Sequence, residues 1–113
     1  MTGLELITTQ SNISLPELTA QIQKDLNLSG IDTKHFDHVD SGEDLIEKLS
    51  NFIQDILTYH PADFDRFMYR VDVPEKDFSK LLSTDLQLLV EQIVYLVLKR
   101  EIQKILFRKQ FGQ

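Results

Sequence analysis

The sequence predicts an all-α protein, a small irregular bundle of four or five helices around a long C-terminal helix at about 85–111. Two observations support this fold class. Apolar residues recur at three- and four-residue steps in most segments, as they do on one face of a helix. The last segment is the longest stretch without Gly or Pro, and its first part, 86–98, is apolar except at Gln87, Glu91 and Gln92. A helix that is apolar nearly all round is expected to be buried by its neighbours.

The N-terminal segment contains few apolar residues, so we expect residues 1–13 to form a flexible arm ahead of one domain at 14–113. Ser14 and Glu17 form a capping box, in which the Ser hydroxyl and the Glu carboxylate satisfy backbone N–H groups at a helix start. This pattern predicts that the first helix begins after Ser14. We expect Gly30 to adopt the left-handed backbone conformation that ends this helix.

A second capping pattern, Ser41 followed by Asp44, predicts the start of the next helix. The segment that follows has the strongest amphipathic pattern in the chain. Pro61 ends this helix near Tyr59 or His60, because the residue before a proline is driven away from helical geometry. Pro61 also begins a third helix, since proline is favoured in a first helical turn.

The third helix is expected to end at Asp72 and Pro74, and a short fourth helix follows. Ser83 or Thr84 is the expected N-cap of the last helix, because Gln87 lies three residues after Thr84. The front half of the last helix, 86–98, should form the centre of the bundle. We interpret Glu91 as part of a polar edge of that helix; a functional acid with a raised pKa is the less favoured interpretation.

The rear half of the last helix is basic. Residues 99–113 contain five basic residues and one acidic residue, a net charge of +4, whereas the whole chain carries −6 and the remainder therefore −10. We expect this tail to protrude and to complement an acidic surface, on a protein partner or at 32–47 of its own chain or of a second copy. The candidate interface residues are Lys99, Arg100, Ile102, Lys104, Ile105, Leu106, Arg108, Lys109 and Phe111. Binding of nucleic acid or of an anionic membrane surface through the same tail is an alternative.

One loop has a composition that could bind a metal ion. It contains five imidazole or carboxylate side chains within nine positions: Asp32, His35, Asp37, His38 and Asp40. These are usual ligands of zinc, iron or manganese. The favoured interpretation is a solvated loop in which the aspartates form turns and caps, and a metal-binding protein is the alternative.

Several functional classes are disfavoured. The absence of cysteine excludes disulfides, thiol nucleophiles and Cys-ligated metal sites. There is no Gly-rich phosphate loop, catalytic motif, secretory signal or apolar run of about 20 residues that could span a membrane. We therefore expect a small acidic cytoplasmic protein without a cofactor, which acts in protein–protein interaction rather than as an enzyme.

Overall fold

The computed structural model describes residues 12–79, 81 and 85–112, and over these residues it contains helices and no strand. The predicted all-α fold with a long C-terminal helix is confirmed. The helices are α2 (Leu15–Leu28), α3 (Gly42–Tyr59), α4 (Pro61–Val71), α5 (Glu75–Phe78) and α6 (Leu86–Phe107). Two further short helices complete the described chain: a 3₁₀ turn, η1 (Lys34–Phe36), and a π-helical turn, η2 (Arg108–Gly112), which continues α6.

The helix starts predicted from capping patterns are confirmed for α2 and α3. Ser14 Oγ accepts a hydrogen bond from the Glu17 backbone N at 3.2 Å, and Ser41 Oγ accepts one from the Asp44 backbone N at 3.0 Å. Gly30 has φ +76°, the left-handed conformation expected after α2. Pro61 ends α3 and begins α4, as its fixed φ and missing N–H predict.

Because the Ser41 hydroxyl satisfies an otherwise unpaired N–H group, we expect Ser41→Ala to lower the free energy of unfolding by about 1 kcal/mol. Urea unfolding followed by circular dichroism measures the change. Ser41→Thr keeps a hydroxyl at the N-cap and should cost only a fraction of this amount. Equal losses in both variants would show that the cap hydrogen bond is not the cause.

Two predicted boundaries need correction. The N-cap of α6 is Asp85, whose Oδ1 accepts a hydrogen bond from the Leu88 backbone N at 3.2 Å. The predicted caps, Ser83 and Thr84, lie outside the described residues; Asp caps as well as Ser or Thr, and Asp85 directly precedes the first helical turn. Ile13 is buried in the core, so the arm predicted for 1–13 extends too far at its C-terminal end. Residues 1–11 lie outside the described residues.

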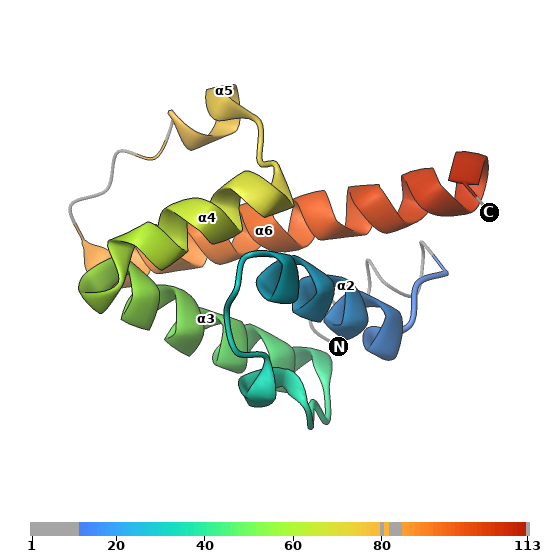
Figure 1. Ribbon diagram of the computed structural model, residues 1–113, viewed down its shortest axis with the longest axis horizontal. Helices are drawn as coiled ribbons and strands as arrows, with labels where there is room; N and C mark the ends of the chain where they lie inside the picture. The colour runs from blue at the N-terminus through green and yellow to red at the C-terminus, as the bar shows by residue number, and fades with distance from the viewer. Residues whose placement is uncertain (1–11, 80, 82–84, 113) are drawn as a thin grey trace.

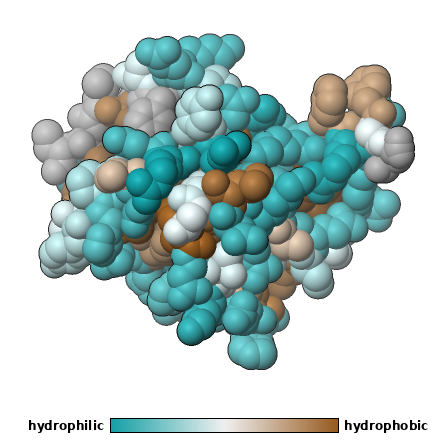
Figure 2. All heavy atoms as spheres, in the orientation of Figure 1, coloured by the Kyte–Doolittle hydropathy of each residue, from teal (hydrophilic) through white to brown (hydrophobic). Residues whose placement is uncertain are grey.

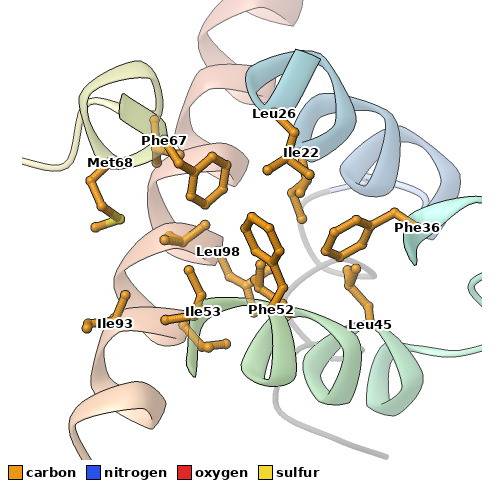
Figure 3. Close-up of a cluster of buried hydrophobic side chains, with 14 of the residues drawn as sticks. Ile22, Leu26, Phe36, Leu45, Phe52, Ile53, Phe67, Met68, Ile93 and Leu98 are labelled. Atoms are coloured by element: carbon orange, nitrogen blue, oxygen red, sulfur yellow. The ribbon is translucent and has the colours of Figure 1, made fainter. Parts of the chain in front are cut away.

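Helix α6 packs against α2, α3 and α4, while α4 also packs against α2 and α3 (Figure 1). The core lies among these four helices. The Phe52 ring of α3 meets Phe36 and Phe67 edge to face, with ring centroids 6.0 and 5.7 Å away (Figure 3). Phe36, which ends η1 between α2 and α3, is fully buried. Its packing against Phe52 holds this connecting segment against the core.

The expected division of α6 into a buried front half and a free rear half holds only in part. In the front half Leu86, Leu88 and Tyr95 are 42%, 46% and 60% exposed. In the rear half Ile102 and Ile105 are buried, because α2 packs against this part of the helix. Helices α2, α3 and α4 cover one side of α6 along most of its length. The buried side of α6 therefore runs through both halves of the helix, and the opposite side stays open.

Candidate functional site

The five Asp and His residues of the loop after α2 do not form one cluster. Asp32 Oδ1 accepts a hydrogen bond from the Lys34 backbone N at 3.0 Å, and Asp37 Oδ1 accepts one from Gln23 Nε2 at 3.4 Å. The backbone N of Asp40 donates to Asp44 Oδ2 at 3.0 Å. Asp32 thus forms a local turn contact, as turn-forming residues do, whereas Asp37 contacts α2 and Asp40 contributes its backbone N–H to Asp44.

His35 and His38 have exposed side chains. Within residues 12–79, 81 and 85–112, no group of three His, Asp or Glu side chains is placed so that it could hold a metal ion. The loop therefore gives the metal-binding alternative no geometric support.

Most cations of the tail are bound within the same chain. Lys109 Nζ lies 2.9 Å from Glu17 Oε2, and Arg108 Nη1 donates to Gln21 Oε1 at 2.8 Å, so both side chains reach α2. Arg100 binds the end of α4, where its Nε donates to the Asp72 carbonyl O at 2.9 Å. Within the described residues of one chain, the acidic groups that pair with the tail cations come from α2, the end of α4 and α6 itself. The contact of the tail with 32–47 of a second copy stays a prediction.

A buried charged cluster lies between α2 and α6. Lys104 Nζ is 2.5 Å from Asp25 Oδ2 and 3.1 Å from Glu101 Oε1, and Gln21 Nε2 lies 3.5 Å from Asp25 Oδ2. Asp25 and Glu101 are 3% and 0% exposed. One ammonium group thus faces two buried carboxyl groups, an arrangement that is stable only while the charges balance.

The pKa of Glu101 is raised to about 9, mainly by burial and also by a hydrogen bond to Asp25 and the negative charge of Asp25, while Lys104 opposes the shift. Within the described residues, no hydrogen bond of good angular geometry reaches either Glu101 oxygen, although Lys104 Nζ lies 3.1 Å from Oε1. A protonated Glu101 can donate to the Asp25 carboxylate, which explains why the neutral form is favoured. Both carboxyl groups of the cluster are buried, and this geometry indicates a structural element rather than a binding site.

The open side of α6 carries a line of exposed residues that we call the outer stripe: Leu88, Tyr95, Lys99 and Leu106. Their spacings of 7, 11 and 18 residues from Leu88 are close to whole numbers of helical turns, so all four side chains leave the helix in nearly the same direction. The stripe extends over about 27 Å at 1.5 Å per residue. Three of its four members are apolar or aromatic.

A groove of about 480 Å³ lies beside the front part of the outer stripe, between α6 and the α5 segment. The apolar residues that line it are Leu81, Leu88, Tyr95 and Leu96. Its charged residues are Asp77, Glu91 and Lys99. Glu91 is exposed, so the sequence-based interpretation of this residue as a polar edge is confirmed.

The projecting end of the chain has a second exposed apolar group. Phe107 and Phe111 are each 66% exposed, with their ring centroids 4.9 Å apart. Figure 2 shows this end as a tan projection beside the teal, hydrophilic surface of the bundle. Phe107 directly follows Leu106, so its ring leaves the helix about 100° away from the outer stripe.

Comparison with known proteins does not assign the chain to a family. No protein-family model, curated protein or solved structure matches the chain. Among the described residues, no helix is both long and apolar enough to cross a lipid bilayer. The function must therefore be argued from the surface of α6 itself.

The structure separates the nine candidate interface residues into three groups. Ile102 and Ile105 belong to the core of the chain. The cations at 100, 104, 108 and 109 bind groups on α2 and α4. Lys99, Leu106 and Phe111 remain exposed for a partner. Sequence reasoning missed Leu88, Tyr95 and Phe107, although the seven-residue step from Leu88 to Tyr95 could have indicated a shared face.

Proposed function

We propose that this protein is a small, non-enzymatic interaction domain that associates with a second copy of itself through the outer stripe of α6. The observation that carries the proposal is the exposure of large apolar side chains along one side of the longest helix. Leu88, Tyr95 and Leu106 are 46%, 60% and 38% exposed on a helix whose opposite side forms the core. Contiguous exposed apolar surface of this kind is typical of protein–protein interfaces.

The charges of the tail support a protein partner over a nucleic acid. A protein that binds DNA or RNA needs several cations free to contact phosphates. Here the ion pairs of Lys104 and Lys109 with Asp25 and Glu17 neutralise two cations, and Arg100 pairs with Asp72. The overall charge of −6 would also repel a polyanion.

The test is the mass of the full chain in solution, measured by sedimentation equilibrium over a range of concentrations. We expect the mass to rise from 13.2 kDa towards twice that value as the concentration increases. Replacing two stripe residues together, Leu88→Ser with Tyr95→Ser, should weaken association at least about tenfold, because large apolar and aromatic anchors carry most interface energy.

The matched control is Tyr59→Ser, which removes an aromatic side chain that is 72% exposed and belongs to α3 rather than to the stripe. It should leave the association constant unchanged. A mass of one chain at every concentration would overturn the proposal, as would equal weakening by the stripe and control variants.

A further inference from the structure

We infer that two copies pair through an antiparallel contact of their α6 helices, with a two-fold axis at Tyr95 that places Glu91 of each copy against Lys99 of the other. This inference rests on the proposed function and adds the occupant's orientation and register to it. It depends on the arrangement of charge around Tyr95, which is independent of the apolar exposure argued above.

Two charged residues are placed symmetrically about Tyr95. Glu91 and Lys99 lie four residues before and four residues after Tyr95. Each is therefore about 6 Å from Tyr95 along the helix axis, and the two are rotated by about 40° in opposite directions around it. The residue types at these symmetric positions carry opposite charges.

Two-fold symmetry determines which groups of the two copies meet. A two-fold interface uses the same surface on both copies, so each charged group meets the symmetry-related position of the other copy. An axis through Tyr95, perpendicular to α6, brings Lys99 of the second copy to the side of Glu91 of the first. Both ion pairs then form at once, on either side of the central Tyr95 contact.

The other two-fold arrangement, in which the two α6 helices run parallel, is unfavourable. If the two α6 helices ran parallel, Glu91 would face Glu91 and Lys99 would face Lys99 of the second copy. Like charges at an interface cost several kcal/mol, so the surface discriminates against that pairing. Antiparallel pairing is the arrangement in which the patch complements itself.

Both groups are available for these contacts. Glu91 and Lys99 are exposed, and within the described residues neither makes an ion pair in its own chain. The apolar side chains Leu88 and Leu96 flank Tyr95 and supply the area around the two ion pairs. Asp77 of α5 lines the same groove as Glu91 and Lys99, so a further negative charge lies close to the contact.

Charge reversal tests the register. Glu91→Lys should place two cations together at each contact, and Lys99→Glu two anions, so each variant should self-associate at least about tenfold more weakly than the unchanged chain. The variant that carries both changes restores opposite charges and should recover self-association. An equimolar mixture of the two single variants should form mixed dimers, because one chain then carries both cations and the other both anions.

Glu47→Lys is the control for the change in net charge, since Glu47 is exposed on α3. It should not alter the association constant. If the unchanged chain associates but the double variant and the mixture fail to recover binding, the antiparallel register is wrong while the proposed function stands. If the unchanged chain is a monomer at every concentration, both are wrong. Because both positions are on the surface, each variant should keep the fold, and circular dichroism checks that it does.

Discussion

Replacing Lys104 by Met is expected to lower the free energy of unfolding by about 3 kcal/mol or more. The Lys104 ammonium lies 2.5 Å from Asp25 Oδ2 and 3.1 Å from Glu101 Oε1, between two carboxyl groups that solvent does not reach. Met keeps most of the aliphatic side chain and removes the charge. The Asp25 carboxylate then remains buried without a counter-ion, and removal of one partner from a buried pair typically costs about 3–5 kcal/mol.

Urea unfolding at pH 7, followed by circular dichroism at constant ionic strength, measures this loss. Lys24→Met is the matched control, because Lys24 is exposed on α2 and the same chemical change there should shift stability by less than about 0.5 kcal/mol. Similar stability of Lys104→Met and the control would mean that water or another group screens Asp25, and the buried cluster would lose its structural role.

The features that could be predicted from the sequence are those fixed by local interactions. A serine hydroxyl that caps a helix needs only the backbone three residues away, so Ser14 and Ser41 mark helix starts without any knowledge of the fold. Pro61 restricts its own backbone and that of its neighbour, which is enough to separate α3 from α4. Periodicity also assigned the core positions of α3 and α4.

The sides of α6 could not be assigned in the same way. A helix that is apolar nearly all round gives no periodic signal for which side is buried, and the choice depends on where α2, α3 and α4 pack. Leu88 and Tyr95 therefore became exposed although the sequence predicted that they were buried. The reverse error occurred at Ile102 and Ile105, where local positive charge suggested a free tail.

Glu101 shows how far neighbouring charge can mislead. It lies among basic residues and looks like part of a solvated helix face, whereas the structure buries it completely. The available signal was spacing. Glu101 lies three residues after Leu98 and four before Ile105, which places it on the buried side of the helix. On α2, Asp25 lies three residues after Ile22, by the same pattern.

A second large effect is expected from Glu101 itself, because its protonation is linked to folding. The pKa of its carboxyl group is raised to about 9 in the folded chain, from the ordinary value of 4.5. Between these values the folded state binds one more proton than the unfolded state. The contribution of Glu101 to stability is therefore complete below about pH 4.5 and is lost as the pH rises towards 9, by about 1.4 kcal/mol per pH unit at most.

Glu101→Gln removes this proton linkage while it keeps the size of the side chain and a group that can donate to Asp25. We expect the variant to be more stable than the unchanged chain at pH 8, by about 2–3 kcal/mol, and the difference to shrink steadily towards pH 5. Urea unfolding at half-unit steps from pH 5 to pH 8.5 measures the two profiles. Glu91→Gln, the same change at an exposed position of the same helix, should run parallel to the unchanged chain. If Glu101→Gln also runs parallel, Glu101 does not hold its proton in the folded state. The α2–α6 contact would then contain a full ion triad, in which Lys104 faces two negative charges.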